Sequence, residues 1–247
     1  WWQAALAVVL GVALASCGGG SRTYPAGELT IVASPSLTDA ITGMVHAFTT
    51  TYPAVQIVTV FEPDSRIAER ATQTPPPDLV VAEDPATLQS AGITDFVPVA
   101  RGQIVLAVQL DNPLVVRGLA DLARPEVRVA LCDPAEPCGE VTDRVLAAAA
   151  VTVPTARFEP DVRPALRRVT EGSADVALVY RSDAVAAGEE VMTIEVPESA
   201  VALADFVAAV PPAAANPAVA RTFLDYLVSS PVRDALTRDG FRPVETA

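Results

Sequence analysis

Short apolar β-type runs alternate along this chain with segments of helical apolar spacing. The first three β-type runs are 29–33, 55–61 and 78–82, and the helix-like segments 38–50 and 65–73 separate them. Alternation at this spacing favours βαβ units, in which crossover helices join parallel strands. We therefore expect an α/β fold.

The same alternation returns in the second part of the chain, so two similar α/β halves are expected. Two such lobes that face each other across a cleft occur in many binding proteins and in several enzymes, and the fold alone does not decide function. The predicted strands are 104–110, 127–131, 176–180 and 201–210, and the predicted helices are 140–149, 162–172, 218–228 and 232–240.

Composition narrows the class of protein. The chain has 247 residues, of which 51% are hydrophobic and 19% charged, enough apolar material for a sizeable core. Its formal net charge is −13, and this acidic balance argues against nucleic-acid binding, which needs a basic surface. A local anion site remains compatible with it, because a local field can differ in sign from the net charge.

The amino terminus predicts export. Residues 1–16 are uncharged and shorter than the roughly 20 residues that a membrane-spanning helix needs, and we interpret them as a signal peptide with a truncated start. The run Leu14-Ala15-Ser16-Cys17 resembles the bacterial lipobox, which implies cleavage before Cys17 and lipidation of that residue. An ordinary signal peptide with a chance cysteine stays open. Residues 17–27 are expected to be a flexible tether.

The other two cysteines, Cys132 and Cys138, lie six residues apart. In an exported protein such a pair can close a small disulfide loop, and two buried free thiols are the alternative. A metal site is not indicated, because His46 is the single histidine and lies far away in sequence.

Four segments in order resemble the molybdate-binding proteins of bacterial ABC transporters, which belong to the type II periplasmic solute-binding family. In the second segment the family has an aspartate, an apolar strand, a small residue and then Ala-Asp. The resemblance covers nearly the whole chain from Glu28. The segments are 33–40, 78–84, 119–139 and 161–184, with a further match at 223–241.

This resemblance implies a two-lobed periplasmic-binding-protein-like fold, each lobe a mostly parallel sheet flanked by helices, with the ligand cleft between them. Lobe one would comprise 28–103 plus 203–247 and lobe two 104–202, closing on the ligand by a hinge. Together with the lipobox at Cys17, it further implies a monomeric, extracytoplasmic lipoprotein held at the outer face of the cell membrane. Its partner would be an ABC transporter permease, with no cofactor and no nucleic acid.

The resemblance also implies the ligand, a tetrahedral oxyanion such as molybdate or tungstate, held by neutral donors. Ser36 and Tyr180 would donate their hydroxyls, and Cys138 and Val162 their backbone N–H groups at helix starts. The alternatives are a plain helix cap for Ser36 and packing roles for Tyr180 and Val162.

One position departs from the family pattern. Asp64 falls where a ligating serine is expected, and Ser65 follows it. A carboxylate in contact with a second unit negative charge repels that charge by up to about 4 kcal/mol at an effective dielectric constant of 20. Three explanations stay open. Ser65 donates while Asp64 caps the helix outward with Arg66 as screening partner, or Asp64 accepts a proton from a protonated oxyanion, or the protein binds a different ligand or none.

Other function classes have weaker support. Catalysis would need an activated nucleophile or an acid–base set, and the acids Asp39, Glu62, Asp64, Glu83 and Asp84 are merely scattered near strand ends. We therefore expect no enzymatic activity. A cytoplasmic regulator would need a DNA-binding helix-turn-helix, whereas we interpret the first residues of this chain as a secretion signal. The main alternative is a binding protein of the same fold for sulfate, phosphate or an organic solute.

Overall fold

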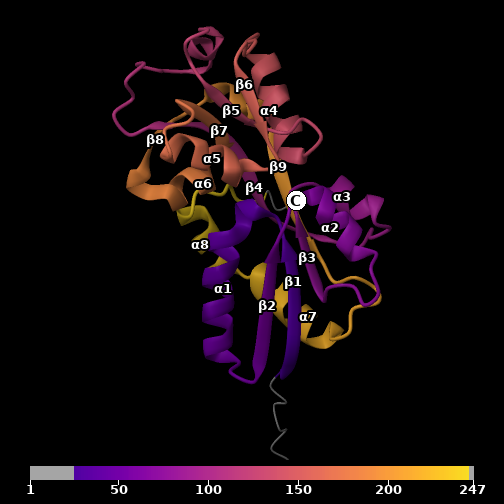
Figure 1. The fold of residues 1–247 in the computed structure, drawn as a ribbon. Coiled ribbons are helices and arrows are strands. Elements are labelled where there is room, and N and C mark those ends of the chain that lie inside the picture. Colours follow the sequence, from indigo (N-terminus) through magenta and orange to yellow (C-terminus); the bar gives the residue numbers. More distant parts are fainter. Residues whose placement is uncertain (1–24, 245–247) are drawn as a thin grey trace, which may run out of the picture.

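A computed structural model describes residues 25–244, so the predicted signal peptide and the predicted lipidation at Cys17 lie outside the described residues. Nine strands form a sheet with the order β2-β1-β3-β9-β4-β7-β5-β6, and β8 pairs with β4 (Figure 1). Across 25–244, no helix combines the length and apolar character that crossing a membrane requires.

We call the first group of elements the β1 half. Its strands β1, β2 and β3 are parallel, and β9 joins β3 in antiparallel orientation. The elements are β1 (Gly27–Ala33), β2 (Val55–Phe61), β3 (Leu79–Ala82), β9 (Leu203–Ala209), the 3-10 turn η1 (Pro35–Leu37), α1 (Thr38–Thr51), α2 (Asp64–Ala71), α3 (Pro85–Ser90), α7 (Pro217–Leu227) and α8 (Ser230–Arg238).

The second group, the β7 half, lies at the other end of the molecule in Figure 1. Here β5 pairs in parallel with both β6 and β7. The elements are β5 (Val129–Cys132), β6 (Ala156–Glu159), β7 (Val176–Tyr180), β8 (Val191–Ile194), α4 (Pro137–Ala148), α5 (Val162–Thr170), α6 (Arg181–Ala187) and the 3-10 turns η2 (Leu119–Ala123), η3 (Gly188–Glu190) and η4 (Pro197–Val201).

One long strand, β4 (Val97–Gln109), belongs to both halves. Its residues up to Gln103 pair with β9, and from Ile104 onward it pairs with β7 and β8. The change of partners falls at the predicted first crossing between lobes. The lobe bounds themselves, 28–103 plus 203–247 and 104–202, stay a prediction.

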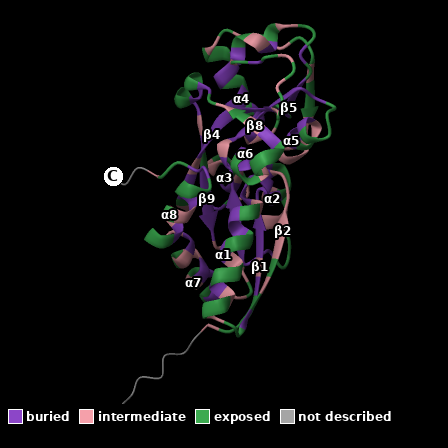
Figure 2. Cartoon of the chain, turned by 90° about the vertical axis from the view of Figure 1, so that its left-hand side faces the viewer, coloured by how far each residue is buried: buried purple, intermediate pink, exposed green. Residues whose placement is uncertain are grey.

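The central strands are buried on both faces. Every residue of β3, β5 and β7 is buried, because helices cover the sheet. Figure 2 shows buried strands, coloured purple, between helices with exposed surfaces. Such strands are expected to be continuously apolar instead of alternating. At the far end of the β1 half, Phe48 of α1 packs edge-on against Phe223 of α7 with ring centroids 5.0 Å apart.

The predicted fold class, an α/β fold with helices flanking the sheets, is confirmed. Strands joined by crossover helices are parallel, as predicted, while β4, β8 and β9 add antiparallel pairs. The strand predictions 55–61 and 176–180 match β2 and β7. The sequence analysis did not predict α3, α6, β6, β8 or the first half of β4.

Candidate functional site

The candidate site lies where the two halves meet. The loop after β1 carries Ser34 and Ser36, and Glu83 comes directly after β3. Because neighbouring parallel strands end at the same edge of a sheet, these residues are brought together. Tyr180, the last residue of β7, reaches the same place from the other half.

The centre of the site is the side chain of Glu83, which is 3% exposed. Its Oε1 accepts hydrogen bonds from the hydroxyls of Ser34, at 2.5 Å, and of Ser36. Its Oε2 accepts the hydroxyl of Tyr180 at 3.2 Å. A single carboxylate therefore accepts hydrogen bonds from hydroxyls of both halves of the molecule.

Tyr180 is held in place by close packing. Its ring packs edge-on against Phe206 with centroids 5.6 Å apart, and its side chain is fully buried. A Cβ at Gly102 of β4 would lie 2.8 Å from the Tyr180 ring, closer than side chains tolerate. Glycine at 102 therefore leaves room for the ring that directs the phenol toward Glu83.

Asp64, the first residue of α2, points inward. Its Oδ2 accepts the backbone N–H of Glu83 at 2.9 Å and the hydroxyl of Thr87 at 2.7 Å. Its Oδ1 is buried without a hydrogen-bond partner. The expectation that Asp64 caps its helix outward with Arg66 as screening partner is wrong, because Asp64 is only 3% exposed and Arg66 pairs with Glu69 instead.

Two further contacts tie the halves together. Ser65 donates its backbone N–H and its hydroxyl to the carboxylate of Glu136, at 3.2 and 2.5 Å, and Glu136 immediately precedes α4. Arg163 of α5 forms an ion pair with Asp39 of α1. Ser65, predicted as a ligand donor, therefore already donates to a carboxylate of its own chain.

The two predicted backbone donors both lie at helix starts. Cys138 is the second residue of α4 and Val162 the first of α5, positions at which intrahelical acceptors are missing. Asp161 caps α5 by accepting the N–H of Arg163 at 2.8 Å. The carboxylate of Asp161 thus already lies at the positive end of this helix.

A disulfide joins Cys132 to Cys138, with Cα atoms 5.8 Å apart. It fixes the end of β5 to the first turn of α4, the turn that presents the Cys138 N–H. Formation of this bond in the exported protein stays a prediction.

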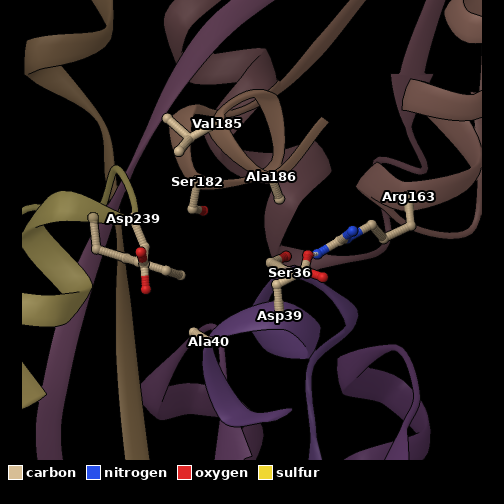
Figure 3. Close-up of a pocket in the computed structure, with 9 residues that line it drawn as sticks. Ser36, Asp39, Ala40, Arg163, Ser182, Val185, Ala186 and Asp239 are labelled. Atoms are coloured by element: carbon tan, nitrogen blue, oxygen red, sulfur yellow. Dashed lines mark hydrogen bonds and ion pairs between the residues drawn. The ribbon is translucent and has the colours of Figure 1, made fainter. Parts of the chain in front are cut away.

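A narrow hollow at this meeting point of the halves has no room for a water-sized sphere. Beside it lies a wider cleft of about 250 Å³, in which Ser36 and Asp39 face Ser182 and Arg163 of the other half (Figure 3). The hollow is lined by Ser34, Pro35, Pro63, Asp64, Glu83, Glu136, Cys138, Pro160 and Asp161.

The acids of the site are shifted toward their protonated forms. Burial raises the pKa of Asp64 well above its ordinary value, and the nearby Glu83 carboxylate adds to this. Burial also raises the pKa of Glu83, although its hydroxyl donors oppose the shift. The pKa of Asp161 is raised by burial as well. Behind Arg163, burial raises the pKa of Asp183 to about 8, although Arg163 Nε lies 2.9 Å from its Oδ1 and favours the ionised form.

The predicted residues therefore differ in placement. Ser36 and Tyr180 converge on Glu83, Asp64 and Cys138 line the hollow, and Val162 follows the lining residue Asp161. The sequence analysis did not assign Ser34, Glu83, Glu136 or Asp161 to the site. A signal for Glu83 was present, because it stands where the quoted family pattern has alanine.

Comparisons with known proteins agree with this fold. The sequence profile of the bacterial extracellular solute-binding proteins matches residues 29–242. The molybdate-binding protein ModA of Mycobacterium tuberculosis H37Rv is 30% identical over 248 residues, covering 96% of this chain and 95% of the relative.

Two solved structures extend the comparison. The periplasmic molybdate-binding protein of Azotobacter vinelandii superposes with a TM-score of 0.77 at 17% identity, over 88% of this chain and 100% of that one. The sulfate-binding protein SubI of M. tuberculosis H37Rv gives 0.73 at 19% identity, over 88% and 87%. The chain belongs to the bacterial extracellular solute-binding proteins, and the molybdate-binding protein ModA is among its homologues.

Proposed function

We propose that this protein is the substrate-binding lipoprotein of an ABC uptake transporter and that it binds a tetrahedral oxyanion, molybdate or tungstate, between its halves. One observation carries the proposal: the hydroxyls of Ser36 and Tyr180, from opposite halves, converge on a single anionic group. That group is the carboxylate of Glu83. The convergence supports a site built to surround negative charge.

The surrounding elements suit an oxyanion. Helices α4 and α5 point their first turns toward the site, and helix N-termini carry a partial positive charge and unpaired N–H groups. Cys138 and Val162 would supply these N–H groups. Neutral donors of this kind hold a fully deprotonated anion without a fixed cation.

A second candidate is an oxyanion that bears a proton, such as hydrogen phosphate. It is favoured by the buried Oδ1 of Asp64, which has no hydrogen-bond partner and could accept a hydrogen bond from the proton of the ligand. Sulfate is a third candidate, because a structural relative is a sulfate-binding protein.

The remaining features follow from the same proposal. Lipidation at Cys17 would hold the protein at the outer face of the membrane, where it would deliver its ligand to the permease as a monomer. The lobes 28–103 plus 203–247 and 104–202 would close about a hinge where the β4 partners change.

Isothermal titration calorimetry with molybdate, tungstate, sulfate and phosphate tests the proposal. We expect molybdate and tungstate to bind most tightly. Ser36→Ala and Tyr180→Phe should each weaken binding about fivefold or more, because a lost hydrogen bond costs about 1 kcal/mol and more when its partner is charged.

Ser173→Ala is the matched control, because Ser173 is exposed, lies outside the hollow, and donates its hydroxyl to the carbonyl of Arg168. This variant should bind as the wild type does. If none of the four anions binds, the proposal is refuted. Unchanged affinity in both Ser36→Ala and Tyr180→Phe would refute the placement of the site.

A further inference from the structure

We propose that Glu83 sets the affinity of this site as an internal competitor: its carboxylate takes the hydroxyls that the oxyanion needs and must release them before the oxyanion binds. The inference rests on the proposed function and deepens it. Glu83 would then control oxyanion affinity and not only support the fold.

The number of hydroxyl protons limits which groups the site can bind at one time. A hydroxyl has one O–H to donate. Ser34, Ser36 and Tyr180 all donate to Glu83, so none of the three can donate to an oxyanion while Glu83 holds it. Binding through Ser36 and Tyr180 therefore requires Glu83 to release these hydroxyls, and a protonated Glu83 would hold them less strongly than the carboxylate does.

The space beside Glu83 is small. Glu83 lines a hollow that does not admit a water-sized sphere, and Asp64, Glu136 and Asp161 line the same walls. The backbone N–H of Glu83 is fixed by Asp64, so the main chain at this position is anchored and the side chain is the part that can turn away. Alanine, which the family pattern has here, would open this volume to a ligand.

Charge around Glu83 also limits binding. Four acids surround Glu83 from separate elements: Asp64 of α2, Glu136 before α4, Asp161 before α5 and Asp183 of α6. Of the nearby cations, Arg163 is shared between Asp39 and Asp183, and Arg167 acts on Asp161. A dianion that enters this group meets repulsion, and a proton on Glu83 would reduce both the repulsion and the competition.

The sign of the pH effect follows. A falling pH protonates Glu83, and burial raises the pKa of Glu83, so this happens at a higher pH than for an exposed glutamate. Tyr180, whose pKa is raised well above its ordinary value by burial, remains a donor throughout. Oxyanion affinity should therefore rise as pH falls.

The test is calorimetric titration of the purified protein with molybdate and with sulfate, at about pH 8 and about pH 6. Sulfate keeps its charge across this range, so a change in its affinity reports on the protein. The variants are Glu83→Ala and Glu83→Gln, and the control is Glu189→Gln, which removes one acidic charge at an exposed position outside the hollow.

We expect Glu83→Ala to bind about tenfold or more tightly than the wild type at the higher pH, because the competitor is gone. Glu83→Gln should gain less, since its amide oxygen still accepts from the hydroxyls but carries no charge. The wild type should gain affinity at the lower pH, and both Glu83 variants should change less. The Glu189→Gln control should follow the wild type.

The outcomes separate the two claims. Equal affinities of wild type and both Glu83 variants at both pH values would overturn the competitor role and leave oxyanion binding intact. Weaker binding by the folded variants would also overturn it, because Glu83 would then contact the ligand directly. If wild type and variants all melt cooperatively and none binds either anion, the proposed function itself fails, and this inference fails with it.

Discussion

At the scale of single residues, the sequence indicated the donors but not their partner. Ser36 and Tyr180 could be found through a family resemblance, because each lies at a recognisable strand end. Their shared contact with Glu83 depends on strands that are distant in sequence ending at one point, and Glu83 is separated from Tyr180 by 97 positions. Asp64 stood out in the sequence as a departure from the family pattern, but its inward direction follows from its contacts with Thr87 and the Glu83 backbone, which a linear pattern does not reveal.

Asp64 gives a prediction at this scale. Asp64→Asn keeps an oxygen that can accept from the N–H of Glu83 and from Thr87, while it removes a buried negative charge. We expect oxyanion affinity to rise by about 1 kcal/mol or more, within the roughly 4 kcal/mol that Coulomb repulsion allows. Calorimetric titration measures it, and an affinity unchanged or lowered for molybdate would show that Asp64 does not oppose the anion.

At the scale of elements, the long periodic segments were predictable and the short ones were not. Helix α1 and strand β2 contain enough residues for their periods to show, whereas β6 and β8 have four residues each. Helix α6 begins immediately after β7, without a loop that could mark its start. The first half of β4 was missed because Pro98, Arg101 and Gly102 interrupt its apolar pattern.

The first turn of α4 gives a prediction at this scale. A Cβ at Gly139 would lie 2.0 Å from the carbonyl oxygen of Asp133, and the backbone there is not free to move aside as a side chain would. Gly139→Ala should therefore displace the turn that presents the Cys138 N–H, lower the free energy of unfolding by about 1–3 kcal/mol, and weaken anion binding.

Gly43→Ala in α1 is the matched control, because nothing lies within 4 Å of its Cβ position. It should stabilise the protein by about 0.5–1 kcal/mol and leave binding unchanged. Chemical denaturation and titration of both variants provide the comparison. A Gly139→Ala protein as stable and as tightly binding as the wild type would exclude the packing argument.

At the scale of the whole molecule, the chain joins two α/β halves through β4, and its acids gather where the halves meet. The carboxyls of Asp64, Glu83, Asp161 and Asp183 all have raised pKa values, mainly because of burial. The net charge of −13 gave no hint that these acids would be adjacent. Burial and convergence, which create the shifts, are properties of the folded chain.

These shifts predict how stability depends on pH. A carboxyl whose pKa is raised on folding stabilises the protein fully below its unfolded pKa, and this contribution is lost as pH rises through the folded value. For Asp183 the window runs from 3.8 to about 8. Glu62 and Asp175 oppose this at the acid end, because arginine partners lower their pKa values and their contribution is lost when these groups are protonated.

The melting temperature should therefore be highest near about pH 5 and fall toward about pH 8. Asp183→Asn should flatten this slope, whatever its effect on absolute stability through the lost ion pair with Arg163. Thermal unfolding followed by circular dichroism across this range provides the measurement. A melting temperature that rises steadily toward pH 8 would contradict the burial of these acids.

We propose that the meeting point of the halves binds a tetrahedral oxyanion. The most direct test is the calorimetric titration of the wild-type protein with molybdate at about pH 6, because a lower pH favours the protonated form of Glu83, whose pKa burial raises. We expect saturable binding of one molybdate per chain, and we expect tungstate to displace it. A folded protein that gives no binding heat with molybdate and none with tungstate would contradict it.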